Sequence, residues 1–256
     1  KIFAAGGLIH QAIILLTRVT TLAPYNLNPQ LMLAHLYLYT KLPDPALKLI
    51  SDVHSWPNTS DLGSTNQTDL LAAESIGLFM QNKKSDAQRL IGSALQQNPD
   101  NTYLLNSLFQ VSLNYGDNTN ALTMADRLLR MNPDDTSLLV NKAYLNMQLG
   151  DVNAAIAALD HVLTLETNNY KARFNRAICY LRVEKYDESR KDYEILQKTF
   201  PDQFQINYGL GEIAFRKRET NAAVQNYEIY LQRAPTNTTE AAIVSSRVKE
   251  LKGGKP

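Results

Sequence analysis

Cysteine, tryptophan, glycine and proline are all scarce in this 256-residue chain, which has 1, 1, 11 and 10 copies of them. The single cysteine, Cys179, excludes an internal disulfide framework and leaves the compartment undecided. Apolar residues make up 44% of the chain and charged residues 20%. With so few glycines and prolines, this composition indicates a folded protein rather than a disordered one.

The net charge is also small, and the sequence has no long apolar run. The net charge of +1 argues against a general nucleic-acid binder, which would carry a strongly basic face. The most apolar stretch, "LIHQAIILL" at residues 8–16, is too short for a membrane span, which needs ~20 residues. The sequence therefore predicts no nucleic-acid partner and no membrane insertion by this segment, while the localisation is unknown.

Catalytic and metal-binding motifs are missing from the sequence. There is no P-loop, no glycine-rich dinucleotide fingerprint and no nucleophile elbow. None of the four histidines has a partner at the i, i+4 spacing of a helical metal site: His10, His35, His54 and His161. Cys179 lies beside a predicted packing position, so we expect a buried, inert thiol. The chain is predicted not to be an enzyme and to bind no cofactor or metal.

What the chain does have is a repeat. "NPDNTYLL" at 98–105 returns as "NPDDTSLL" at 132–139, 34 positions later. Proline cannot continue a helix, and Asn or Asp before Thr supplies an N-cap, so the motif predicts the end of one unit and the start of the next. Three series share the period over residues 68–237: Pro99, Pro133, Pro201 and Pro235; Ala87, Ala121, Ala155, Ser189 and Ala223; Ser75, Phe109, Ala143, Ala177 and Gly211.

This pattern resembles the tetratricopeptide repeat family, whose unit is a helix–turn–helix of about 34 residues. The clearest unit, "YKARFNRAICYLRVEKYDESRKDYEILQKTFP", matches the family's signature places with Ala177, Tyr180, Ser189, Tyr193 and Pro201. The last unit matches with Leu210, Gly211, Ala223, Tyr227 and Pro235. The resemblance implies an all-α fold, a right-handed superhelical solenoid of antiparallel helix pairs.

The expected organisation is a single solenoid over 1–256, with about six and a half units and a C-terminal capping helix. Because it opens partway through a unit, we expect a fragment of a longer repeat protein. The ranges are a partial unit at 1–26, a degenerate unit at 27–67 with a polar insertion at 57–67, in-phase units at 68–101, 102–135, 136–169, 170–203 and 204–237, the capping helix at 238–251 and a tail at 252–256.

Two features depart from the family pattern. Phe109 is bulky where a small residue is expected, so the packing there should adjust locally. The capping helix lacks the small-residue series and is predicted to be amphipathic, with Ile243, Val244, Val248 and Leu251 on one stripe. Its expected task is to cover the open end of the stack.

The resemblance also implies a binding surface, because the first helices of the units line the concave face of such solenoids. Amides there can pair with a peptide backbone, cations can hold a carboxylate, and aromatic rings provide flat contact area. The candidate groove residues are Asn106, Gln110, Asn141, Tyr144, Lys171, Phe174, Asn175, Arg182, Tyr208, Glu212 and Arg216.

Two members of this set hold equivalent places in successive units. Asn141 and Asn175 are similar to two rungs of the asparagine ladder of some superhelical relatives, and Ser107 and Gly209 end the series on either side. Asn175 stands where the carboxylate-clamp members of the family need Arg, which argues against a clamp for chaperone tails. For every groove residue, the alternative is an ordinary solvated helix face.

Three hypotheses on function follow. The first is a non-catalytic scaffold that binds an extended segment of another protein, of unknown identity, in its concave groove. The second is the partner- or substrate-docking region of a larger enzyme or membrane-anchored protein. The third is a structural module that self-assembles into a homo-oligomer. Phe174 and Tyr144 could equally serve packing between neighbouring first helices.

Overall fold

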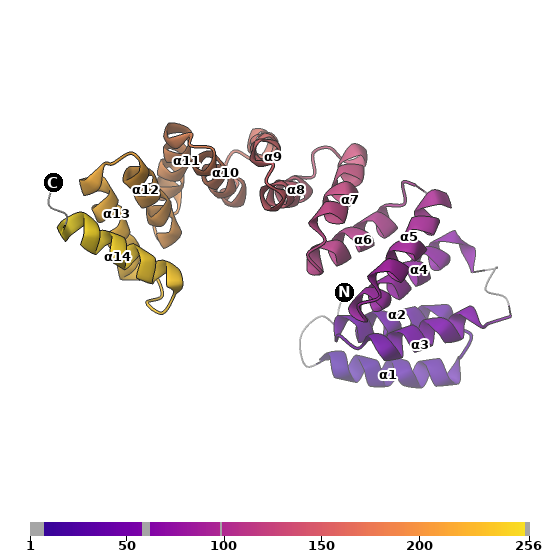
Figure 1. Ribbon diagram of the computed structural model, residues 1–256. Helices are drawn as coiled ribbons and strands as arrows, with labels where there is room; N and C mark the ends of the chain where they lie inside the picture. The colour runs from indigo at the N-terminus through magenta and orange to yellow at the C-terminus, as the bar shows by residue number, and fades with distance from the viewer. Residues whose placement is uncertain (1–7, 58–61, 98, 254–256) are drawn as a thin grey trace. The chain divides into compact units, whose positions relative to one another are not determined.

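The computed structural model describes residues 8–57, 62–97 and 99–253, which form fourteen α-helices and no β-strand (Figure 1). The architecture is the all-α helical solenoid that the repeat predicts. The chain divides into two compact units, Lys1–Met131 and Asn132–Pro256.

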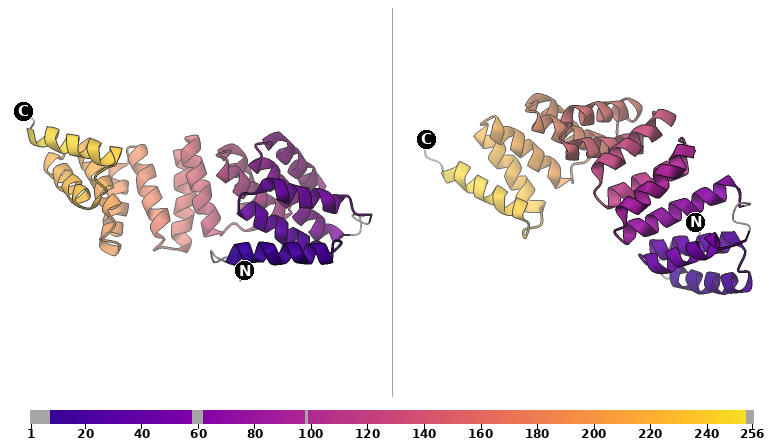
Figure 2. Two further views of the ribbon diagram at one scale, coloured as in Figure 1. Left: turned by 90° about the horizontal axis from the view of Figure 1, so that it is seen from below. Right: turned by 45° about the vertical axis from the view of Figure 1, so that its right-hand side comes forward.

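Within each unit, consecutive helices run antiparallel and lie side by side (Figure 2). Unit 1 contains α1 (Leu8–Leu22), α2 (Leu27–Tyr39), α3 (Pro43–His54), α4 (Gly63–Met80), α5 (Lys84–Gln97), α6 (Thr102–Asn114) and α7 (Asn118–Met131). Unit 2 contains α8 (Thr136–Leu149), α9 (Val152–Leu165), α10 (Tyr170–Arg182), α11 (Tyr186–Thr199), α12 (Phe204–Arg216), α13 (Thr220–Arg233) and α14 (Thr239–Gly253).

The repeated motif that opens the units caps helices, as predicted. The Asn101 side chain accepts a hydrogen bond from a backbone N–H in the first turn of α6, at 3.0 Å. Asp135 does the same for α8 at 2.9 Å, and Asn169 for α10 at 2.9 Å. Each cap satisfies one of the backbone donors that a helix start leaves without a partner.

The turn inside each hairpin contains one residue in the left-handed region. In unit 2 these are Gly150 (φ 89°), Glu184 (φ 60°) and Arg218 (φ 60°), which are spaced by the repeat period. Gly150 adopts this conformation without strain, whereas a side chain there costs of order 1 kcal/mol. The turn geometry is therefore a property of the repeat that does not depend on glycine.

Within unit 2, the paired helices meet at small residues. The members of the two small-residue series in this unit are all buried: Ala143, Ala155, Ala177, Ser189, Gly211 and Ala223. The Ser189 hydroxyl donates a 2.7 Å hydrogen bond to the Ala177 carbonyl oxygen, so two of these positions are joined directly. In unit 1 the bulky Phe109 is accommodated in the same series and is 1% exposed.

The closest approaches occur at two glycines of α12. A Cβ atom added to Gly209 would lie 2.3 Å from Cζ of Tyr193, and one added to Gly211 would lie 2.6 Å from Cδ1 of Tyr227. Both tyrosines are buried, at 2% and 0% exposure, so neither ring has room to retreat. The same contact explains why the series of asparagines ends at Gly209, because no side chain fits there.

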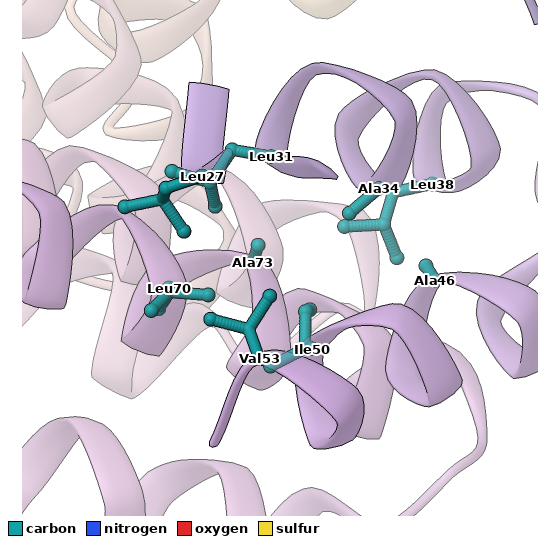
Figure 3. Close-up of a cluster of buried hydrophobic side chains, with 9 residues drawn as sticks. All are labelled: Leu27, Leu31, Ala34, Leu38, Ala46, Ile50, Val53, Leu70 and Ala73. Atoms are coloured by element: carbon teal, nitrogen blue, oxygen red, sulfur yellow. The ribbon is translucent and has the colours of Figure 1, made fainter. Parts of the chain in front are cut away.

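The hydrophobic core of unit 1 includes a cluster built from α2, α3 and α4 (Figure 3). Its alanines let the helices approach, and its leucines and isoleucine fill the space between them. The buried members are Leu27, Leu31, Ala34, Leu38, Ala46, Ile50, Val53, Leu70 and Ala73.

The start of α4 and the stripe of α14 differ in detail from the sequence pattern. α4 begins at Gly63, inside the stretch assigned to a polar insertion, and residues 58–61 lie outside the described residues. In α14 the prediction for Ile243 is wrong, since this side chain is 48% exposed. Ala241, Val244 and Val248 form the buried stripe instead, because their spacing follows the helical period more closely.

Two glycine-to-alanine substitutions test the close packing of α12. Gly209→Ala should destabilise the protein by about 1–3 kcal/mol, since the new methyl group meets the buried Tyr193 ring. Gly92→Ala in α5 is the matched control: a Cβ there meets nothing within 4 Å, so alanine should stabilise the helix by about 0.5–1 kcal/mol. Urea denaturation measures both, and equal effects of the two changes would contradict the packing argument.

Candidate functional site

The predicted groove residues of unit 1 lie on one helix, α6. Asn106 and Gln110 are both exposed. The Asn106 amide donates a 2.8 Å hydrogen bond to the carbonyl oxygen of Thr102, one turn earlier in its own helix. This bond is an intrahelical contact of the kind that surface asparagines make, and both residues lie on an exposed face of α6.

Unit 2 brings two predicted residues into one hollow. Asn141 of α8 and Lys171 of α10 both line a cavity of about 410 Å³ at the N-terminal ends of these helices. The other lining residues are Thr136, Ser137, Val140, Glu166 and Asn169. None of these five belongs to the predicted groove set, although Asn169 stands directly before α10, at the N-cap place that asparagine favours.

Hydrogen bonds hold the rim of this hollow. The Glu166 carboxylate accepts from the Thr136 hydroxyl at 2.7 Å and from the Asn169 amide at 2.7 Å. These bonds, with that from Thr136 first, lower the pKa of the Glu166 carboxyl from its ordinary value. Asn169 caps α10 through its other amide atom, so one side chain fixes both the helix start and the rim.

The lining offers one cation, one anion and several neutral donors and acceptors. Asn141 is half-buried, whereas Lys171 and Ser137 are exposed, so their polar groups are accessible from solvent. An amide can donate to a carbonyl and accept from an N–H, which matches the two groups of a peptide backbone. The arrangement can therefore hold polar backbone groups together with a charged group.

The aromatic members of the predicted set are not equivalent. Phe174 packs inside unit 2: its ring stacks on Tyr170 of the same helix at 5.6 Å and meets Tyr193 of α11 edge-on at 5.8 Å. Tyr144 of α8 is 50% exposed. Phe174 is therefore engaged in packing, against a buried cluster that includes Tyr193 of α11 and Ile206 of the next first helix, α12, whereas Tyr144 lies open on the surface.

The remaining polar residues of α10 and α12 differ in their surroundings. Asn175 is half-buried, and Arg182 and Arg216 are exposed. Arg182 donates to the carbonyl oxygen of Met147 at 3.4 Å, which links α10 to α8. A guanidinium has further donors, so this contact leaves Arg182 able to bind another group.

Glu212 does not lie on an open surface, which corrects the expectation for this residue. It is 6% exposed, and its carboxylate accepts from the Tyr227 hydroxyl at 2.7 Å and from the Arg247 guanidinium. Tyr208, half-buried, stands beside it with its ring 5.4 Å from that of Tyr230. Arg247 belongs to α14, so the last helix covers this end of the predicted groove.

Among the described residues there is no group of three or more His, Cys, Asp or Glu side chains that could hold a metal ion. Cys179 is completely buried, and burial raises the pKa of its thiol to about 11. Over the same residues, no helix combines the length and the apolar character that crossing a bilayer requires.

Comparisons of the sequence with family models find repeats. Residues 174–238 match a model described as tetratricopeptide repeat. Residues 114–194 match the model of anaphase-promoting complex, cyclosome, subunit 3. Residues 174–238 therefore belong to the tetratricopeptide repeat family. No curated protein sequence is recognisably similar to it.

Solved structures of tetratricopeptide repeat proteins have a similar fold. The C-terminal part of a repeat-containing protein from Cytophaga hutchinsonii is 15% identical, with a TM-score of 0.71 over 92% of this chain and 94% of that chain. A repeat protein from Parabacteroides merdae is 19% identical, with a TM-score of 0.65 over 89% and 87%. YrrB, described as having an unusual peptide-binding site, is 14% identical, with a TM-score of 0.56 over 90% and 97%.

The ion pair between Glu212 and Arg247 is open to a direct test. Arg247→Met should destabilise the protein by about 1–3 kcal/mol, because the Glu212 carboxylate loses its cation while staying buried. Lys252→Ala is the control: it removes an exposed pair with Glu228 and should change stability by less than about 0.5 kcal/mol. Denaturant titration measures the free energy of unfolding of both variants. Equal values would show that the Glu212–Arg247 pair does not hold α14 in place.

Proposed function

We propose that this chain is a non-catalytic scaffold that holds an extended segment of another protein on the first-helix face of unit 2. The observation that carries the proposal is the polar hollow between α8 and α10. It brings Asn141 and Lys171 together although they lie on different helices. The tetratricopeptide repeat fold, which suits interaction between proteins, supports the general class of function.

The contact with a ligand follows from the chemistry of the lining. Asn141 pairs with a backbone amide group of the bound segment, which makes this contact independent of the ligand's side chains. Lys171 provides a charge for an acidic group, and Glu166 provides one for a basic group. Because the rim is already held by hydrogen bonds, binding orders few side chains and loses little entropy.

The hollow offers little apolar surface, so the affinity for a ligand that contacts the hollow alone is expected to be low. Val140 is the apolar residue among those lining the hollow, so little apolar surface is buried there. Contacts along the neighbouring helix faces, such as exposed Tyr144, would have to add to the binding energy. The proposed ligand is therefore a segment longer than the hollow itself.

Removing the two central groups tests the proposal. The double variant Asn141→Ala/Lys171→Ala should weaken binding of a captured partner by about 2 kcal/mol, roughly 30-fold, since it removes a hydrogen bond and a charge-assisted contact. The control Asn153→Ala/Lys191→Ala changes two exposed residues of the second helices α9 and α11, away from the hollow and from the first-helix face. Capture from lysate identifies the partner and calorimetry measures the affinity.

Equal binding by the two double variants would move the site away from this hollow. Loss of binding in both would indicate a general effect on the fold. Circular dichroism of each variant separates that outcome from a loss of contacts. Retention by the control together with loss in Asn141→Ala/Lys171→Ala is the expected result.

Self-association is a second candidate function, which one surface favours. α1 carries an exposed apolar stripe along one face, with Leu8, Leu15, Val19 and Leu22 exposed by 44, 59, 42 and 83%. Such a stripe is typical of a surface that another helix covers. If copies of the chain associate here, the mass from light scattering should rise with concentration, and Leu15→Glu should abolish that rise. A constant mass would contradict self-association.

A further inference from the structure

A second cavity lies in unit 1, between the second helices of two successive hairpins. It has a volume of about 340 Å³ and lies between α5 and α7, and one residue of α6 also lines it. The residues that line it are Gln88, Gly92, Leu95 and Gln96 of α5, Leu108 of α6, and Asn120, Met124 and Arg127 of α7. None of them belongs to the first-helix face that the proposed function uses. We call this cavity the outer groove.

Hydrogen bonds join the walls of the outer groove near both of its ends. Near the start of α7, Gln88 donates to the Asp117 carboxylate at 3.2 Å, and the Asn120 side chain donates to the same oxygen at 2.7 Å. Toward the other end, Arg127 donates to the carbonyl oxygen of Pro99 in the loop after α5. Because these bonds join α5, α7 and the loop, the groove is formed before any ligand arrives.

Gly92 makes α5 different from the corresponding helices. In the other in-phase units, the place of this glycine is taken by an acidic residue, namely Asp126, Asp160, Glu194 and Glu228. A Cβ on Gly92 would meet nothing within 4 Å, so no neighbour requires the glycine for packing. Glycine also weakens a helix interior relative to alanine. The fold does not explain this residue, whereas a chain passing close to the α5 backbone would.

The lining predicts the chemistry of such a chain. The floor is apolar, since Leu95, Leu108 and Met124 are each less than 9% exposed, and methionine adapts to irregular shapes. Gln88, Gln96 and Asn120 present amides along the walls, which suit a peptide backbone. Arg127 is the charged residue of the lining, and its remaining N–H groups can bind a carboxylate.

We propose that the outer groove of unit 1 binds an extended segment of a partner protein in which an apolar residue lies next to an Asp or Glu. The apolar side chain sits on the floor, the backbone passes over Gly92, and the acidic group pairs with Arg127. The missing acid at position 92 removes both the bulk and the negative charge that would exclude such a segment. This surface is separate from the hollow of unit 2, so each proposal can fail without the other.

A selection experiment with defined variants tests the proposal. The protein, covering all 256 residues, is offered a phage-displayed library of short random peptides. The test variant is Gly92→Glu, which introduces the type of residue that the other units have at this place. It should fold normally, since the site is open and glutamate favours helices. Gly92→Ala adds a methyl group alone at this place, Ser93→Glu adds an acidic residue to the same helix outside the lining, and Asn141→Ala/Lys171→Ala reports on the hollow of unit 2.

The expected result is enrichment of peptides that combine an apolar with an acidic residue. They should bind Ser93→Glu and Asn141→Ala/Lys171→Ala as they bind the unchanged protein. They should bind Gly92→Ala more weakly, because a methyl group separates the peptide from the α5 backbone, and Gly92→Glu at least about tenfold more weakly. Methyl NMR of the five methionines then locates the contact. The Met124 signal should shift on addition of a selected peptide and should stay in place in Gly92→Glu.

Several outcomes would overturn the proposal. These are no enrichment, enrichment of peptides without an acidic residue, equal binding to Gly92→Glu, or an unmoved Met124 signal. Peptides that lose binding only to Asn141→Ala/Lys171→Ala would assign recognition to unit 2 instead. A mass that rises with concentration and returns to that of one chain in Gly92→Glu would show that a second copy, rather than another protein, occupies the groove.

Discussion

Close contact between helices at small side chains is the constraint on which the rest of this structure depends. In unit 2, the Ser189 hydroxyl reaches the Ala177 carbonyl oxygen, and Gly209 leaves room for the buried ring of Tyr193. A larger side chain at these points would separate the helices and shift all their outer faces. Because small residues recur every 34 residues where the paired helices meet, α8 and α10 start next to each other, and their first turns enclose the polar hollow.

The connection after α9 serves the fold and the candidate site together. Asn169 caps α10 with one atom of its amide group and holds Glu166 with the other, while Thr136 binds the same carboxylate from the start of α8. A backbone that is capped in this way has few alternative conformations, so the groups around it keep their positions. The rim is therefore rigid for the same reason that the helix begins where it does.

The sequence predicts the helices and their order well, because the caps and the small residues recur at one period. It also places Asn141 and Lys171 on neighbouring first helices, and the structure brings both to one cavity. Glu212 follows the same pattern, yet its surroundings depend on Arg247, a long-range partner from a helix outside the repeat. Glu166 was missed because its role depends on hydrogen bonds to side chains of two different helices, which no local pattern reveals.

The double role of Asn169 also bears on how such a protein can diverge. Ser137 and Val140 line the same hollow without a capping role, so mutations there can alter ligand preference at little cost to folding. A mutation of Asn169 alters the ligand surface and loosens α10 in one step. Selection for new partners should therefore change the floor and walls of the hollow first, and descendants that bind different segments should still share its rim.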